Sequence, residues 1–145
     1  MPVANYASEI WGYKDFQCCR NIQNRAMRYY LGVHKFAPIA GMQGDLGWLS
    51  VKYVRYKYMV NFWNRLVKME DDRLTKHIFK YDYELCRGNW SADMNKIFSL
   101  LNMHAVFENI FLCNVENALE QLVYENNRQW NEIVHSKPKL RTYFF

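Results

Sequence analysis

The chain has 145 residues, a length that one domain commonly occupies. Half of the residues are hydrophobic and 23% are charged, and only 6 Gly and 3 Pro occur, which excludes a disordered or loop-dominated chain. The formal net charge is +5 with histidine neutral, which favours anionic partners without specifying one.

The first predicted helix covers residues 16–31. Apolar residues recur there three or four positions apart, as at Phe16, Cys19, Ile22, Ala26 and Tyr30, while three arginines fall mainly on the other side. Gly32 is expected to end this helix. Before it, residues 2–7 form at most a short extended segment. After it, the glycines and proline of residues 33–49 predict a loop or a short helical turn.

A long helix over residues 51–69 follows, with Ser50 as its N-cap. Its apolar residues repeat with helical spacing and are expected to face the core. They are Val51, Val54, Tyr58, Met59, Phe62, Trp63, Leu66 and Met69.

Three further helices are predicted downstream. Asp72 caps the first of them, which Gly88 ends, and Ser91 caps the second. The third runs over residues 114–135 and is stopped by Pro138. In the first of the three, the side chains expected to face inward are Leu74, Ile78, Phe79 and Tyr83. The whole chain, residues 1–145, is therefore predicted to be a single all-α domain, an irregular bundle of five or six helices.

The cysteines and histidines give no sign of a catalytic or metal site. Four cysteines, two of them adjacent, form neither a disulfide framework nor a metal-binding clip, so they are expected to be thiols in a reducing compartment. The four histidines are dispersed and lack metal-ligand spacing. We predict no catalytic residue, no metal, no cofactor and no small-molecule substrate.

Signals for export or membrane insertion are also not expected. The N-terminus has no charged region before an apolar run, and the least charged stretch, residues 97–115, is too polar to span a bilayer. An intracellular protein, nuclear or cytoplasmic and without membrane attachment, is the expectation.

Residues 70–72 form an acidic run that superficially resembles the carboxylate pair of nucleic-acid polymerases. Polymerases present that pair on a strand hairpin, whereas this run lies between two predicted helices. A helix-capping role is therefore preferred to metal binding.

Charge is unevenly distributed along the chain. Residues 1–68 hold 10 Lys and Arg against 3 Asp and Glu, while residues 69–145 hold 9 against 11. Cations on the polar faces of two successive helices are suited to phosphates, and the tyrosines between them can stack on bases, although helical spacing sends some tyrosines to the core. The candidate nucleic-acid-binding residues are Arg20, Arg25, Arg28, Lys52, Arg55, Lys57, Arg65 and Lys68.

Four motifs occur in an order that is similar to a known family. They are YASEIWG at residues 6–12, YLGV at 30–33, GDLGWL at 44–49 and KPKLRTY at 137–143, with Trp90 and Trp130 in similar places. Together they resemble the region downstream of the polymerase palm in non-LTR, LINE-like retrotransposon reverse transcriptases. The resemblance covers essentially the whole chain. It departs at Asp45, where the family commonly has Glu.

The resemblance implies a helical thumb and connector that grips RNA or an RNA–DNA duplex. The family's fingers, palm and Cys/His-rich tail are absent, so the chain would be a fragment or relic of an RNA-directed DNA polymerase without catalysis by itself. Glu9, Trp11 and Asp45 are expected to fix the fold. Surface that would pack on a palm is then exposed, which predicts self-association.

A host-domesticated helical module that binds a protein is the alternative function. In that case the basic surface would serve solubility alone.

Overall fold

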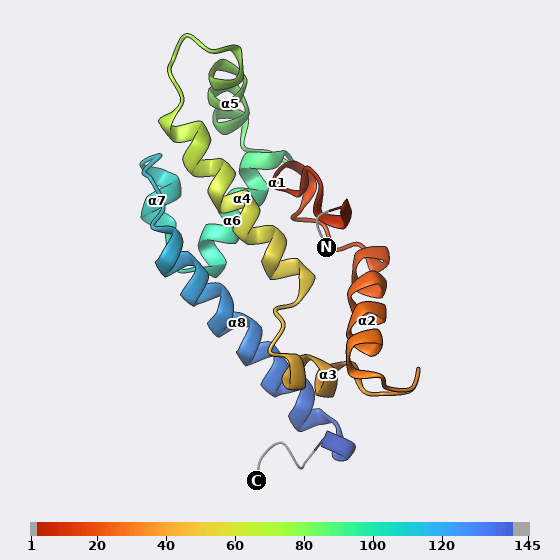
Figure 1. The fold of residues 1–145 in the computed structure, drawn as a ribbon. Coiled ribbons are helices and arrows are strands. Elements are labelled where there is room, and N and C mark those ends of the chain that lie inside the picture. The colour runs from red at the N-terminus through yellow and green to blue at the C-terminus, as the bar shows by residue number, and fades with distance from the viewer. Residues whose placement is uncertain (1–2, 141–145) are drawn as a thin grey trace.

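A computed structural model describes residues 3–140, and every regular element in that range is a helix (Figure 1). The fold class predicted from the sequence is therefore confirmed. The elements are η1 (Val3–Asn5), α1 (Ser8–Trp11), α2 (Gln17–Leu31), α3 (Ile39–Leu46), α4 (Val51–Lys68), α5 (Leu74–Leu85), α6 (Trp90–Leu100), α7 (His104–Glu108) and α8 (Val115–Ser136).

Helix α4 crosses the centre of the molecule and carries the core. Trp63 is fully buried, and its indole packs against the rings of Phe79, Phe98 and Phe107, with centroids 5.2–5.6 Å away. Its Nε1 donates a hydrogen bond of 3.0 Å to the carbonyl of Phe111. One side chain thus joins α4 to α5, α6 and α7.

Helix α8 lies along α4 and also holds α3 (Figure 1). The backbone N–H of Ser50 donates to Asn126 Oδ1 at 3.0 Å, which ties the start of α4 to α8. Trp130 Nε1 donates to the carbonyl of Ala40 at 2.7 Å. A second, small apolar cluster, Ala40 with Val134 and Leu140, lies at this end of the molecule.

Helix α2 lies at the edge of the molecule, and one glutamine fixes its position. Gln23 Nε2 donates to the carbonyl of Leu49 at 2.7 Å, and Gln23 Oε1 accepts from the N–H of Val51 at 3.0 Å. Both backbone groups lie at the N-terminal end of α4, so this side chain sets where α2 meets α4.

Several predicted boundaries were wrong by one to three residues. Helix α5 begins after Arg73 rather than after Asp72. It ends at Leu85, before Gly88 is reached, and its C-cap Cys86 has a left-handed φ of 36°. Asn89 caps α6 by accepting from the N–H of Ala92, so Ser91, the predicted cap, lies inside the helix. Asparagine is as good a cap as serine, and composition alone does not choose between them.

Two segments near the N-terminal end are more helical than predicted. The sequence allows at most a short extended segment over residues 2–7, but its described part contains the 3-10 helix η1. Residues 33–49, predicted as a loop or a short helical turn, include α3, which has two turns despite Gly41 and Gly44. Burial of Ala40 and Met42 against neighbouring elements outweighs the low helix propensity of glycine.

The inward faces of two helices also differ from the prediction. In α4, Tyr58 is exposed, whereas Tyr53 and Tyr56 are buried. In α5, Leu74 and Ile78 are 74% and 58% exposed although they were predicted to face inward. The core of α5 rests on the other side of the helix, where Phe79 is buried and Tyr83 packs partly against the core.

Candidate nucleic-acid interface

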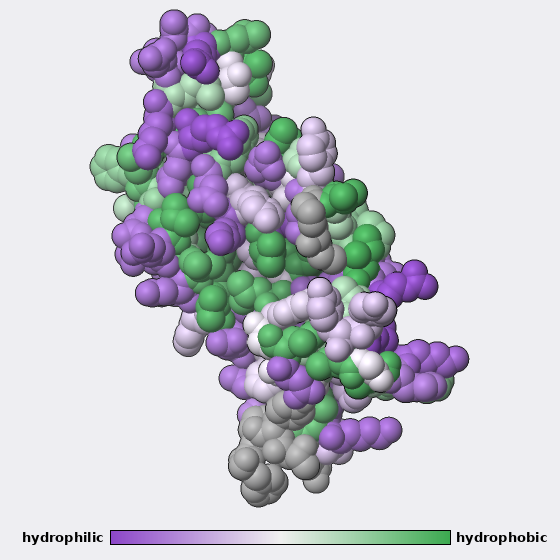
Figure 2. Space-filling view, in the orientation of Figure 1, coloured by the Kyte–Doolittle hydropathy of each residue, from purple (hydrophilic) through white to green (hydrophobic). Residues whose placement is uncertain are grey.

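Helix α2 presents two arginines on the side away from the core. Its buried side consists of Cys19, Gln23 and Met27, spaced four residues apart. Arg25 is exposed, and Arg28, one turn further on, is half-buried with no hydrogen-bond partner for its Nε among the described residues. Figure 2 shows hydrophilic side chains projecting from this edge of the molecule. The guanidinium of Arg25 is therefore available to a ligand, whereas Nε of Arg28 is buried as well as unpartnered among the described residues.

Helix α4 carries a second basic ridge along its outer face. Lys57 is half-buried, and Arg65 and Lys68 are exposed, with the exposed amide of Asn61 between them. A spacing of three or four residues places them in a row along one side of the helix. The row extends about 16 Å at 1.5 Å per residue, enough to reach more than one phosphate of a strand.

The cations of these two ridges make no ion pair with a carboxylate in the part of the chain that the structure describes. Among residues 3–140 the ion pairs engage Arg20, Arg55, Lys80, Lys96 and Arg128. Arg25, Arg28, Lys57, Arg65 and Lys68 take part in none of these pairs. Charge without an internal partner is the form that releases counterions when phosphate binds.

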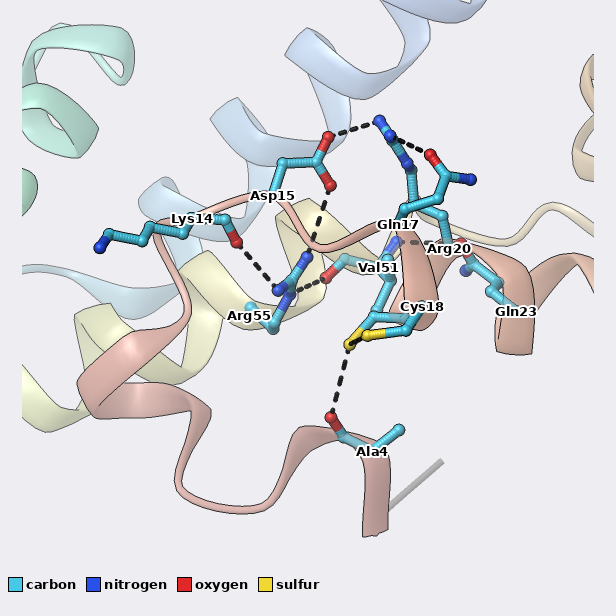
Figure 3. Close-up of polar contacts among 10 residues, drawn as sticks. Ala4, Lys14, Asp15, Gln17, Cys18, Arg20, Gln23, Val51 and Arg55 are labelled. Carbon is cyan, nitrogen blue, oxygen red and sulfur yellow. Dashed lines mark hydrogen bonds and ion pairs between the residues drawn. The ribbon is translucent and has the colours of Figure 1, made fainter.

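Arg20, by contrast, is already engaged. Its guanidinium contacts the carboxylate of Asp15 and the amide oxygen of Gln17, as Figure 3 shows. Asp15 is about half exposed, so the pair can open to solvent at modest cost. Arg20 is thus a weaker candidate than Arg25.

Arg55 was predicted to be a phosphate ligand, and the structure overturns that assignment. Its side chain is fully buried. Nη1 donates to the carbonyl of Lys14 at 3.1 Å and Nε to that of Val51 at 3.4 Å, while Nη2 lies 4.0 Å from Asp15 Oδ1 (Figure 3). The guanidinium also lies over the ring of Trp11, 5.5 Å from its centroid.

The position of Arg55 in the helical repeat explains this error. It lies four residues after Val51 and four before Met59, both of which are buried. Residues at that spacing share one side of a helix, so Arg55 belongs to the inward face. The helical spacing that places Arg55 on the inward face could be read from the sequence. The residue type argued against burial, because arginine is almost never fully buried without a partner. Here it links the segment between α1 and α2 to α4.

The tyrosines beside these cations serve the core rather than a ligand. Tyr56 stacks on Tyr13, with centroids 5.8 Å apart, and burial raises the pKa of Tyr53 and Tyr56 above the ordinary value. Lys52 lies half-buried over both rings, 5.4 and 5.7 Å from their centroids. Of the three interleaved tyrosines, only Tyr58 presents an exposed ring.

The C-terminal end of α4 forms a shallow basic hollow of about 360 Å³. Arg65 and Lys68 line it together with Glu70 and with Arg73, which was not among the predicted cations. Lys76 lies nearby but is buried, donating to the carbonyls of Leu66 and Val67 at 2.8 and 2.9 Å. Because Lys76 provides hydrogen bonds to carbonyls at the end of α4, the exposed side chains of Arg65, Lys68 and Arg73 are not needed there and remain in solvent.

Two larger hollows flank the outer ridge of α4. One, of about 520 Å³, lies between α2 and α4 and includes Gln23, Val54 and Tyr58. The other, of about 850 Å³, lies between α4 and α8 and includes Lys57 and Trp130. Its remaining lining residues are Gln43, Gly44, Gly47, Trp48, Leu49, Leu119, Val123, Asn126, Asn127 and Asn131.

The predicted cations therefore do not form one continuous patch. Arg65 and Lys68 share a hollow and Lys57 lines a different one, while Arg25 and Arg28 line none of the three hollows. The cations thus form two separate basic ridges, one on α2 and one on α4. Such an arrangement suits contact with phosphates at more than one point of a nucleic-acid backbone.

One carboxylate of the acidic run is already paired with a lysine. Asp71 Oδ1 accepts from Lys80 Nζ at 2.7 Å, and this contact lowers the pKa of the Asp71 carboxyl. Among the described residues, no three His, Cys, Asp or Glu side chains come together in a way that could hold a metal ion. In the same residues, no helix has the length and apolar character needed to cross a membrane.

Comparison with known proteins gives no match: no family model, curated protein or solved structure is similar to this chain.

Proposed function

We propose that this chain is a nucleic-acid-binding helical domain that holds the phosphate backbone of RNA or an RNA–DNA duplex through the outer faces of α2 and α4. It performs no catalysis by itself. The proposed role is that of the thumb and connector of the retrotransposon reverse transcriptase family, of which the chain would be a fragment or relic.

The observation that supports the proposal is that five of the eight predicted cations make no ion pair among residues 3–140: Arg25, Arg28, Lys57, Arg65 and Lys68. The two halves of the chain differ in net charge. Residues 1–68 hold 10 Lys and Arg against 3 Asp and Glu, whereas residues 69–145 hold 9 against 11. The positive field is thus carried mainly by the first half of the chain.

The motif GDLGWL gives the proposal a second support. Gly44, Gly47, Trp48 and Leu49 line the hollow beside Lys57. Indole faces and amide groups next to a cation are chemically suited to an unpaired nucleotide at the edge of a bound strand. The residues that carry the family resemblance therefore adjoin the basic ridge of α4.

The test is duplex binding as a function of salt. A fluorescent RNA–DNA duplex is titrated with the chain and with a variant carrying Arg25→Gln, Arg28→Gln, Lys57→Gln and Lys68→Gln. Each lost phosphate contact is expected to reduce the slope of log affinity against log salt by about 0.9, so four contacts reduce it by about 3.6.

A matched variant separates contact from overall charge. Arg20→Gln, Lys80→Gln, Lys96→Gln and Arg128→Gln together remove the same four charges, but from side chains that are already paired. This variant is expected to keep most of the wild-type slope. Equal losses in the two variants, or no binding by the folded wild-type chain, would refute the proposal and favour a protein-interaction module.

A further inference from the structure

Helix α5 bears an apolar stripe that the described part of the chain leaves uncovered. Leu74, Ile78, Tyr81 and Leu85 are 74%, 58%, 65% and 56% exposed. They are separated by four, three and four residues, the spacing of an a and d seam in a coiled coil. Figure 2 shows hydrophobic residues along one edge of the region where α5 lies.

The opposite side of α5 anchors the helix firmly to the molecule. Phe79 is buried against Trp63, and Tyr83 donates its hydroxyl to the carbonyl of Phe107 at 2.8 Å. Lys76 donates to the last carbonyls of α4. The helix therefore cannot rotate its apolar stripe inward without losing these contacts, and the stripe stays available to a partner.

We infer that this stripe is a dimerisation surface, on which α5 of a second copy of the chain packs in antiparallel orientation. In that arrangement Leu74 meets Leu85 of the second copy and Ile78 meets Tyr81. Each contact occurs twice around the two-fold axis, so the stripe is its own complement.

The charged residues beside the stripe support an antiparallel copy. With Ile78 and Leu85 at a positions, His77 and Glu84 occupy the two g positions, which face each other across an antiparallel pair. His77 can then donate to Glu84 of the second copy, and the reverse contact forms at the other end.

A parallel pair of α5 helices would have a less favourable contact for His77. It would bring His77 to Asp82, but Asp82 Oδ2 already accepts from the backbone N–H and the hydroxyl of Ser91, at 2.9 and 2.7 Å. Glu84, in contrast, is exposed. The inference does not depend on nucleic-acid binding, since none of the cations proposed to contact phosphate lies on α5.

Sedimentation equilibrium of the purified chain between about 10 µM and about 1 mM tests the inference, because interfaces of this small size associate weakly. Wild-type chain is expected to dimerise within this range. Tyr81→Glu should raise the dissociation constant at least about tenfold, since a charge would replace apolar contact in both of the symmetry-related Ile78–Tyr81 pairs.

Tyr29→Glu is the matched control. Tyr29 is 86% exposed on α2, so the same substitution adds the same charge away from the stripe and should leave the dissociation constant unchanged. Helical circular dichroism of both variants checks that each is folded. A wild-type chain that stays monomeric throughout the range, or an equal effect of the two variants, would overturn the inference.

Exchanged charges test the orientation. His77→Glu alone should weaken the homodimer, because like charges then meet across the g positions. Glu84→Lys alone should also weaken it, because the carboxylate that accepts from His77 is lost. An equimolar mixture of the two variants should restore dimers, in which each pair joins opposite charges or histidine with glutamate. Failure of the mixture to recover dimers while the wild type dimerises would overturn the antiparallel arrangement.

Discussion

Replacing Arg55 with alanine tests whether a buried cation links the N-terminal segment to the core. Arg55 donates at 3.1 Å to the carbonyl of Lys14 and lies over the ring of Trp11. A hydrogen bond from a charged donor contributes about 1.5–3 kcal/mol, and a desolvated cation–π contact contributes about 2 kcal/mol. Truncating a buried side chain of this size costs a further 2 kcal/mol or so in lost packing.

An opposing term reduces this sum. The guanidinium is fully buried, its Nη2 has no hydrogen-bond partner among the described residues, and Asp15 lies 4.0 Å away, so desolvation of the charge is only partly compensated. We therefore expect Arg55→Ala to lower the free energy of unfolding by about 3 kcal/mol. Arg55→Met, which keeps the volume and removes the charge, should cost about 1 kcal/mol.

Urea unfolding followed by circular dichroism measures both values, with Arg25→Ala as an exposed control expected to stay within about 0.5 kcal/mol of wild type. An Arg55→Ala variant as stable as Arg25→Ala would refute the buried linkage. The same variants separate structure from binding. Arg55→Met should leave the salt slope of duplex binding unchanged, whereas Arg25→Ala should lower it.

Three further outcomes follow from buried polar groups. Gln23→Ala should lower the free energy of unfolding in urea by about 2 kcal/mol, since it leaves the Leu49 carbonyl and the Val51 N–H without their partner. Gln17→Ala, at an exposed position of the same helix, should change this free energy by less than about 0.5 kcal/mol. Equal effects of the two substitutions would contradict the role of Gln23 in joining α2 to α4. Burial raises the pKa of Cys113 to about 11, so in the folded chain at mildly alkaline pH a thiol reagent should modify exposed Cys18 well before Cys113, as mass spectrometry of the products would show. Burial also raises the pKa of Tyr56 above its ordinary value of 10.0. The folded state then holds this proton more tightly than the unfolded state, so stability is fully present below pH 10 and falls as pH rises beyond it; Tyr56→Phe should reduce that fall, and an unchanged pH profile would count against it.

Only part of the candidate site could be predicted from the sequence. Charge and helical spacing correctly assigned Arg25, Arg65 and Lys68 to exposed positions, because an exposed helical face is set by local periodicity. The same reasoning failed at Arg55, whose burial depends on a carbonyl 41 residues earlier in the chain. It also missed Arg73, which joins Arg65 and Lys68 only because the chain turns between α4 and α5.

The sequence by itself determined the all-α class and the approximate extents of α2, α4 and α8. Each of these helices is long enough for the helical spacing of its apolar residues to be recognised in spite of individual exceptions. Tertiary structure alone decided which side of α5 faces inward, because Phe79 and Tyr83 find aromatic partners on α4 and α7, whereas Leu74 and Ile78 find none among the described residues. A short helix with apolar residues on two sides carries no local signal for choosing between them, so the choice rests with the surfaces that other segments bring against it.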